Sequence, residues 1–421
     1  MKKIFAAGFV ILFTIGFQMT AFAVYKPLMV PAIKTSQGHP AAETTSQPTQ
    51  HAPMIFSPSA LCMYNAKPME LSVEKSSSVD NKTCFATIKA ALDYAESHKA
   101  CGVKLTIDNG EYPDPLTITR NTILMAKKTA TTHKNPSISG SIHNLAGHKL
   151  FLENISIMNA QDVGLEQNGG ELQMSNVLVA HTKAQPDLIN SGLGVRLTGG
   201  VRASIGSLKL WDNASTALFV SGAATKVKIF DFTVWENRAH PLAVKLVVQK
   251  SGGAISQGLA AVDVSDGALL LVEDYSIKNC EFIGLVARQN GRVHLKSGWV
   301  EGTRSVAASG SERYGGTNLQ ASELGRIELK NFSTRKAEAC GLMAWGGYMK
   351  AATGEVKGNA IGFSGHNPPV ATYDVVKCVT GKDIRYYENS INLDTDYLPV
   401  PCPPGDASCN GAAMCPGVLW E

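Results

Sequence analysis

Acidic and basic side chains recur at matching positions of short, strand-like segments, and together they could do chemistry on a charged sugar. Asp263 and Arg196 are each the third residue of such a segment, and Arg288 lies two positions beyond that place in another. Guanidinium groups on either side of a carboxylate could steer an anionic sugar, or the carboxylate could act as a base once its environment has tuned its pKa. The alternative is an ion pair on the surface, which contributes little to stability. We therefore name Asp263, Arg288 and Arg196 as candidate catalytic residues, and we expect Asp263→Ala to leave folding intact.

Aromatic and polar side chains elsewhere in the chain could bind the same ligand. The candidate substrate-binding residues are Glu166, Phe219 and Trp345 in strand-like segments, His240, Arg313 and Tyr314 in two long insertions, and Trp211 and Trp235 at equivalent places of consecutive repeats. Planar rings suit the apolar face of a sugar. The two tryptophans have a competing interpretation, in which the adjacent insertion covers them and they form a small satellite core.

These residues are positioned by a repeat that consists of a strand, one small polar residue and a second strand. Leu150–Ile157 (LFLENISI) aligns with Leu172–Val179 (LQMSNVLV), and five further copies extend to Thr334. A third strand follows each copy, and insertions occur at one place, immediately before it. Because three short strands cannot bury an apolar face alone, the repeat predicts a solenoid of parallel strands around one continuous core. A sandwich would need antiparallel hairpins, which the sequence does not show.

Alternation along the third strand predicts two outward columns, because successive side chains point to opposite faces. The first column is Glu166, Arg196, Phe219, Asp263, Val286, Gln320 and Met343, and the second is Asn168, Thr198, Ser221, Ser265, Arg288, Ser322 and Trp345. Asp263 and Arg288 then lie on adjacent coils, with Arg196 roughly 10 Å from Asp263. The first column is poor in the carboxylates that glycosidic chemistry needs.

At this point the chain resembles the right-handed parallel β-helix of the pectin-lyase-like superfamily, over roughly Cys84 to Leu393. Phe85–Leu92 (FATIKAAL) looks like the helix that caps the first coil in such proteins. Asn154, Asn176 and Asn331 resemble the superfamily's asparagine ladder. The resemblance implies an all-β solenoid whose third-strand face forms the floor of a polysaccharide groove.

The enzyme motifs of that superfamily are missing from the chain. The sequence has no W-x-D-H or R-x-P-x-x-R of pectate lyases, none of the polygalacturonase blocks, and no D-P-H-D of alginate epimerases. No motif indicates a cofactor, calcium included, and the histidines follow no metal-ligand spacing. The missing motifs weigh against a known pectinolytic activity. They do not exclude an enzyme of this fold whose catalytic residues differ from those motifs.

The ends of the chain predict export and a capped solenoid. A basic start, an apolar run and Ala21-Phe-Ala23 predict a secretory signal peptide over 1–23, and an uncleaved anchor is the alternative. We expect a flexible Ser/Thr/Pro-rich spacer over 24–60 and an N-terminal cap over 61–102 with a helix at 85–98. The β-helix should span 103–396, and a Cys/Pro-rich, disulfide-bonded tail that caps the last coil should span 397–421. Nine cysteines in an exported chain favour disulfides over zinc, and Cys84 and Cys101 flank the helix as a natural pair.

The net charge of the whole chain is too small to indicate a polyanionic partner. Thirty-nine Lys and Arg residues face 35 Asp and Glu, for a net charge of +4, which offers no overall footprint for nucleic acid or an anionic membrane. We expect a secreted or periplasmic bacterial protein, with no membrane span after cleavage, that binds a polysaccharide or cell-surface glycan through its third-strand face and loops. The alternative is a polysaccharide lyase, epimerase or hydrolase acting on an acidic glycan. The sequence leaves the oligomeric state open.

Overall fold

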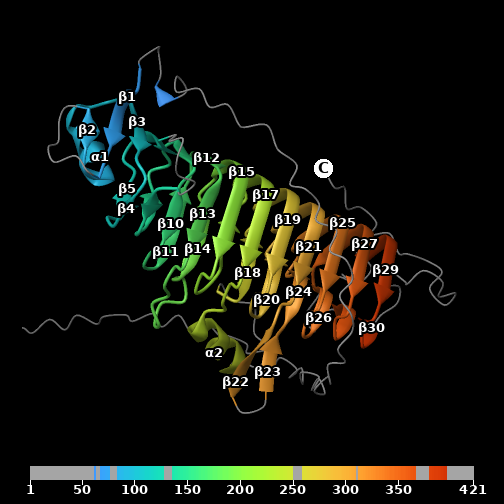
Figure 1. Ribbon diagram of the computed structural model, residues 1–421. Coiled ribbons are helices and arrows are strands. Elements are labelled where there is room, and N and C mark those ends of the chain that lie inside the picture. Colours follow the sequence, from blue (N-terminus) through green and yellow to red (C-terminus); the bar gives the residue numbers. More distant parts are fainter. Residues whose placement is uncertain are drawn as a thin grey trace, which may run out of the picture.

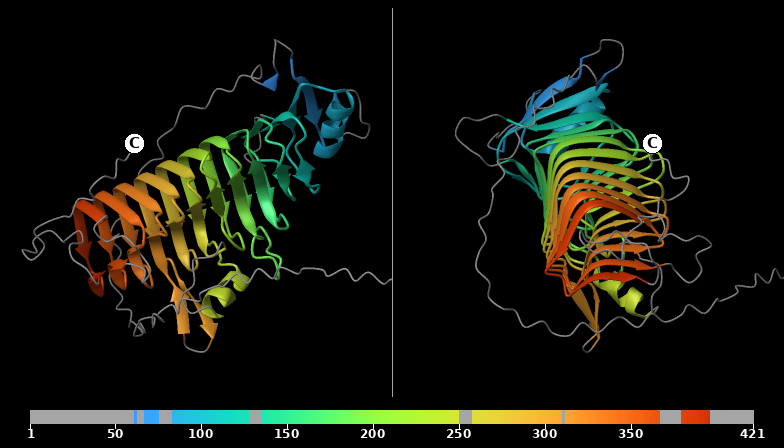
Figure 2. Two further views of the ribbon diagram at one scale, coloured as in Figure 1. Left: turned by 180° about the vertical axis from the view of Figure 1, so that it is seen from behind. Right: turned by 90° about the vertical axis from the view of Figure 1, so that its right-hand side faces the viewer.

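The chain folds as a parallel β-helix in which successive coils stack along one axis (Figure 1). The computed structural model describes residues 61–62, 67–75, 83–127, 135–249, 258–309, 312–366 and 379–395. The predicted signal peptide and spacer, the C-terminal tail and four of the nine cysteines lie outside these residues. Seen nearly along the axis, bent strands of one sheet enclose the core together with a second sheet (Figure 2).

The first sheet, sheet A, contains the first and second strands of every repeat. Its strands are β1 (Met69–Val73), β2 (Cys84–Phe85), β3 (Gly102–Ile107), β4 (Glu111–Tyr112), β6 (Asn121–Ala126), β7 (Ser137–Ile138), β9 (Leu150–Glu153), β10 (Ser156–Met158), β12 (Glu171–Ser175), β13 (Val177–Ala180), β15 (Arg202–Trp211), β17 (Lys226–Trp235), β19 (Leu269–Lys278), β21 (Arg292–Glu301), β25 (Arg326–Arg335), β27 (Tyr348–Lys357) and β29 (Val379–Tyr387). From β15 onward, the two predicted strands of each repeat join into one bent strand of nine or ten residues.

The second sheet, sheet B, contains the third strand of every repeat. Its strands are β5 (Leu116–Thr117), β8 (Ile142–Asn144), β11 (Val163–Asn168), β14 (Leu193–Thr198), β16 (Leu218–Ser221), β18 (Ala260–Ser265), β20 (Ile283–Ala287), β24 (Thr317–Ser322), β26 (Cys340–Trp345), β28 (Ile361–His366) and β30 (Ile391–Thr395). Every strand pair within both sheets is parallel, as the solenoid prediction requires.

The predicted vertical register is confirmed at the two places where it is most specific. Asn176 Nδ2 donates to Asn154 Oδ1 at 2.8 Å, one coil away. Trp211 is the register partner of Trp235 on the next coil. Side chains about two dozen residues apart in the sequence are therefore neighbours along the axis.

A buried polar ladder occupies a different corner from the one that the resemblance implies. Asn213, Asn237 and Asn359, each at most 2% exposed, follow the second strand rather than the bend inside sheet A. Asn359 Nδ2 donates to Asn389 Oδ1 at 3.0 Å, and Asn213 Oδ1 accepts from Thr182 at 2.9 Å. The bond between Asn154 and Asn176 is exposed, because those side chains point out of the coil. The predicted bond between bend asparagines is thus present for Asn154 and Asn176, and a second set of asparagines at the corner before the third strand satisfies buried backbone groups.

Inward residues of sheet A stack aromatic rings against glycines. Phe232, Tyr275, Gly298, Phe332 and Gly354 form one register column. A Cβ at Gly298 would lie 2.0 Å from the carbonyl oxygen of Tyr275, and one at Gly354 would lie 2.2 Å from the Phe332 ring. The glycines make room for the bulky side chains on the coils before them, which fixes the sequence of large and small residues in the core.

The N-terminal cap contains a helix and a disulfide. α1 (Ile88–Ser97) is shorter than the predicted 85–98, because Cys84 and Phe85 pair with β1 and Thr87 caps the helix by accepting a hydrogen bond from Ala90 N at 3.1 Å. Its apolar face buries Ile88, Ala91, Leu92 and Ala95 at the first coils. The disulfide joins Cys101 to Cys62, so the predicted pairing of Cys101 with Cys84 is wrong.

Two insertions project from the corner before the third strand, as predicted. One carries α2 (Pro241–Gln249), and the other carries the antiparallel hairpin of β22 (Ser305–Ser309) and β23 (Glu312–Gly315) (Figure 1). Ala243 and Val244 of α2 belong to a buried apolar cluster with Phe282, Ile283 and Val286, against which Tyr314 of the hairpin packs. The insertions therefore fold back onto sheet B. Neither described helix is long and apolar enough to cross a membrane.

Candidate functional site

The first outward column of sheet B has the register predicted from the sequence. Glu166 pairs with Arg196, Arg196 with Phe219, and Phe219 with Asp263. The column continues through Val286, Gln320 and Met343. The order of the candidates is thus confirmed, but their exposure differs sharply along the column.

Asp263 and Arg288 form a buried ion pair and not a surface one. The Asp263 side chain is 1% exposed and that of Arg288 is 8% exposed. Arg288 Nε donates to Asp263 Oδ1 at 3.1 Å, and Arg288 Nη2 donates to Oδ2 at 3.1 Å. Burial raises the pKa of Asp263, and the Arg288 guanidinium opposes that rise.

The prediction that Asp263 lies on the floor of an open groove is therefore wrong. Val286, the register partner of Asp263, is fully buried in the cluster that includes α2, and Phe219 and Gln320 are also buried. The sequence placed these side chains outside the coil correctly. It did not show that the insertion after β17 folds over this part of sheet B. Asp263 is inaccessible to a polymer, and its carboxylate is already occupied by Arg288.

Arg196 belongs to a different cluster, nearer the N-terminus of the solenoid. Arg196 Nη1 lies 3.3 Å from Glu166 Oε1, and His143 Nδ1 lies 3.1 Å from Glu166 Oε2. The hydrogen bond from His143 lowers the pKa of Glu166, and the Arg196 charge lowers it further. Burial raises the pKa of Asp162 nearby, and the charge of Glu166 adds to that rise. This part of the column thus presents a partly exposed carboxylate between two basic groups.

His143 and Asp162 were not among the sequence candidates. His143 is the register partner of Glu166 on the preceding coil, in β8. The aligned repeats began one coil later, at Leu150, so the column ended before it reached His143. Extending the third-strand column by one coil toward the N-terminus would have found it.

The insertion residues are divided between the interior and the surface. His240 is fully buried, its Nδ1 accepts a hydrogen bond from Leu242 N at 3.1 Å, and its Nε2 lies 3.4 Å from Ser191 Oγ. Arg313 is exposed on the hairpin and donates to Ser305 Oγ at 2.8 Å and to Glu338. Trp345 is half-buried at the end of β26, on the same sheet as Asp263. His240 thus anchors α2 against the loop before β14, while Arg313 braces the base of the hairpin.

Protonation of His240 should destabilise the protein. Burial lowers the pKa of His240 below its usual 6.5, although hydrogen bonds with the backbone of Gln185 and Leu188 oppose the shift. Because the unfolded chain binds the proton more readily, this contribution to stability is present above pH 6.5 and is lost as the pH falls below it. We expect urea midpoints measured from pH 8 to pH 5 to fall less steeply in His240→Gln than in the wild type. His98→Gln, at an exposed histidine, controls for the loss of one histidine as such, and an equal slope in both variants would contradict the assignment.

The two tryptophans form a stacked, half-buried aromatic pair. The Trp211 and Trp235 rings stack with centroids 5.8 Å apart and planes inclined by 16°, and the His181 ring lies 4.4 Å from Trp211. Trp211 Nε1 donates to Glu236 at 2.9 Å. Both indoles are half-buried, and neither belongs to an apolar cluster of the described residues.

Within the described residues, the α2 insertion does not form an apolar cluster with the tryptophan pair. The α2 insertion packs against Phe282, Ile283 and Val286 and leaves the outer face of sheet A uncovered by that cluster. Trp299 lies two coils beyond Trp235 on the same face, with Lys278 Nζ 5.3 Å from its ring centroid. We call His181, Trp211, Trp235 and Trp299 the aromatic strip.

Hydrogen-bonding groups flank the aromatic strip. Asp212 is held by Arg238 at 2.6 Å and by His181 at 3.1 Å, so its carboxylate is fixed beside the stacked rings. A rigid ring surface with polar groups at its edges can contact the apolar face of a sugar and its hydroxyls at the same time. In the described parts of the chain, no three His, Cys, Asp or Glu side chains gather in a geometry that would hold a metal ion. No family model and no curated protein matches the chain.

Proposed function

We propose that this protein is an exported β-helix that binds a glycan through the aromatic strip. The observation that carries the proposal is the stacked, half-exposed Trp211–Trp235 pair, held in place by Glu236 and His181. Burying an aromatic ring against a sugar is favourable, and a preorganised ring loses little conformational entropy on binding. The resemblance of the chain to the pectin-lyase-like superfamily supports a carbohydrate ligand.

The proposal assigns binding to sheet A, not to the third-strand face that the sequence favoured. Asp263, Arg288 and Phe219 are too buried to contact a polymer. The aromatic strip follows the axis across the coils from β13 to β21, so a linear chain could contact several rings at once. Each additional contact raises affinity without a change of fold, which suits a repeat architecture.

Replacement of either stacked tryptophan should weaken glycan binding. We expect Trp235→Ala or Trp211→Ala to raise the Kd for a bound polysaccharide roughly two- to tenfold, because an aromatic contact contributes about 0.5–1.5 kcal/mol. The measurement is calorimetry of the purified protein against a panel of soluble neutral and uronic-acid polysaccharides. The matched control is Trp345→Ala, a half-buried tryptophan on sheet B. A loss of affinity in Trp345→Ala alone would place the site on the third-strand face and overturn the assignment to the strip.

An enzyme is the second candidate, and the cluster of His143, Glu166 and Arg196 favours it. The ionised Glu166 carboxylate lies beside Arg196, and it could accept a proton from an acidic sugar whose charge the arginine neutralises. Incubation with uronic-acid polymers, followed by ultraviolet absorbance of the unsaturated product and by reducing ends, tests this activity. Turnover that disappears in Glu166→Gln and persists in Trp235→Ala would make the protein an enzyme acting at sheet B.

A further inference from the structure

The outer face of sheet A carries a strong excess of positive charge on the first half of its strands. Outward positions of β15, β17, β19, β21, β25 and β27 before the bend hold eight cationic side chains and two carboxylates, Glu273 and Glu328. The cations are Arg202, Lys226, Lys228, Arg292, Lys296, Arg326, Lys330 and Lys350. We call these eight cations, together with Glu273 and Glu328, the basic face. Its excess of six positive charges exceeds the net charge of the whole chain, which is +4.

The two carboxylates neutralise only part of this surface. Glu273 pairs with Lys296 at 2.7 Å and with Lys228 at 3.5 Å, and Glu328 pairs with Lys350 at 3.2 Å. Within the described residues, Arg202, Lys226, Arg292 and Lys330 make no ion pair, and Arg326 lies over the Tyr348 ring at 5.1 Å. Most of the unpaired charge therefore remains available to a ligand.

The unpaired cations lie in a line along the axis of the solenoid. Arg202 pairs in register with Lys226, Lys226 with Leu269, Leu269 with Arg292, and Arg292 with Arg326. Parallel strands are about 4.8 Å apart, so the line from Arg202 to Arg326 extends about 19 Å. The backbone hydrogen bonds between neighbouring parallel strands fix these spacings.

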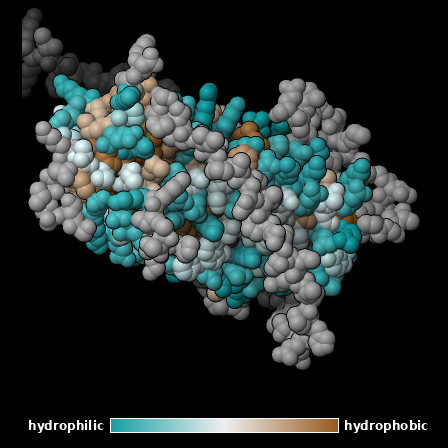
Figure 3. Space-filling model, turned by 45° about the horizontal axis from the view of Figure 1, so that its top comes forward, coloured by the Kyte–Doolittle hydropathy of each residue, from teal (hydrophilic) through white to brown (hydrophobic). Residues whose placement is uncertain are grey.

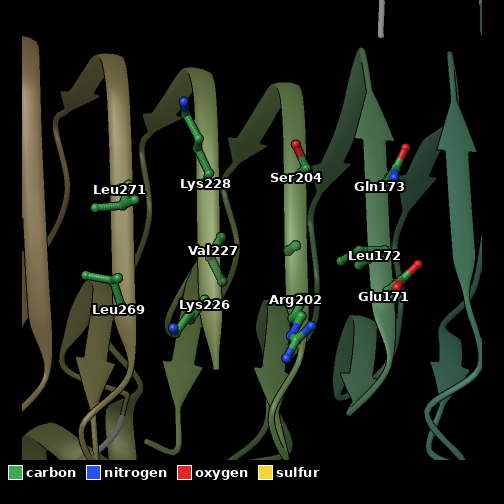
Figure 4. Close-up of a pocket in the computed structure, with 11 residues that line it drawn as sticks. Glu171, Leu172, Gln173, Arg202, Ser204, Lys226, Val227, Lys228, Leu269 and Leu271 are labelled. Atoms are coloured by element: carbon green, nitrogen blue, oxygen red, sulfur yellow. The ribbon is translucent and has the colours of Figure 1, made fainter. Parts of the chain in front are cut away.

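A shallow hollow lies at one end of this line. Its volume is about 440 Å³, and its lining includes Arg202, Lys226 and Lys228 together with Leu269 and Leu271. Glu171 also lines it, and its carboxylate is paired with Lys149 at 3.0 Å. Figure 4 shows Arg202 and Lys226 reaching toward the same end of their strands, while Lys228 points toward the other end. Ser204, a small side chain between longer ones, contributes to the hollow. Hydrophilic residues cover most of the described surface in the view of Figure 3, and apolar residues form only small patches there.

We propose that the basic face binds a linear glycan that carries anionic groups along its length, independently of the aromatic strip. Charge complementarity selects the ligand, because an unpaired row of arginines and lysines favours oxyanions and guanidinium groups bind carboxylate and sulfate in two-point geometry. The straight row favours an extended chain that lies across the strands. Leu269 interrupts the row and contacts the uncharged part of the same chain. Sulfate esters and uronic carboxylates share this chemistry, and the experiment separates them.

Charge reversal on the basic face should weaken binding of a polyanionic glycan. The probes are dextran sulfate, polygalacturonate and single-stranded DNA, and the measurement is Kd at low and at moderate salt by calorimetry. The variant is Arg202→Glu with Lys226→Glu, two outward side chains whose replacement leaves the core unchanged. We expect the Kd for at least one acidic glycan to rise about tenfold or more, and to rise with salt in the wild type as exposed charges are screened. The preferred glycan identifies sulfate or carboxylate as the recognised group.

The matched control is Lys183→Glu with Lys245→Glu, which makes the same change in net charge at exposed lysines outside sheet A. An equal loss in this control would show a non-specific charge effect and overturn the proposal. Tighter binding of DNA than of either glycan would assign the face to nucleic acid and would also overturn it. Because the substituted residues lie outside the aromatic strip, failure of the Trp235→Ala test leaves this result unaffected.

Discussion

Asp263→Ala should reduce the free energy of unfolding by about 3–5 kcal/mol, because it leaves the Arg288 guanidinium buried without its carboxylate. The sequence favoured the opposite expectation, a surface residue whose loss leaves folding intact. Arg288 makes three hydrogen bonds with the two Asp263 oxygens, and both side chains are almost fully removed from water. An uncompensated buried charge is among the few single changes that cost this much.

The measurement is urea denaturation of Asp263→Ala, followed by circular dichroism at pH 7. Asp187→Ala, an exposed aspartate in the loop before β14, is the control and should change stability by less than about 0.5 kcal/mol. The double replacement Asp263→Leu with Arg288→Met should recover much of the loss, since apolar side chains of similar volume need no charge partner. A loss below about 1 kcal/mol in Asp263→Ala would mean that the pair is solvated, as a surface ion pair is.

Removing the disulfide between Cys62 and Cys101 should destabilise the N-terminal cap by about 4 kcal/mol, the loop-closure entropy of a 39-residue separation. The bond joins the segment that contains Leu61 to the start of β3. Leu61 is 1% exposed and packs with Ile123 and Phe151 on the outside of sheet A. In a solenoid each coil depends mainly on its neighbours, so the loss should appear first in the cap and not along the whole β-helix.

Limited proteolysis of Cys62→Ser with Cys101→Ser, compared with the oxidised wild type, measures this local effect. Cleavage should become faster near α1 and β3, while sheet A beyond β15 stays protected. Cys84→Ser is the control, since Cys84 is not part of the disulfide. Unchanged cleavage in the double variant, or an equal increase in Cys84→Ser, would contradict the stabilising role of the bond.

The period of the repeat, visible in the sequence, was sufficient to predict the β-helix and its vertical neighbours. The pairs Asn154–Asn176 and Trp211–Trp235 follow from the spacing of equivalent residues, because the coil fixes one register for all of its strands. The place of the insertions, before the third strand, was also a local property of each repeat. The repeat period determines only which residues are neighbours along the axis of the solenoid.

Burial, disulfide pairing and the distribution of charge were decided by the tertiary structure. Nothing in the residues of α2 says that it packs toward Val286, on the side of Asp263, instead of over Trp211. Cys62 lies outside the repeat, so its approach to Cys101 depends on how the cap folds. Arg202, Lys226, Arg292 and Arg326 are separated by 24 to 66 residues in the sequence, and only the stacking of the coils brings them into one row. The near-neutral composition of the whole chain gives no sign of that row. Sequence periodicity fixes neighbours along the axis, whereas contacts across the axis depend on the path of the non-repeating segments.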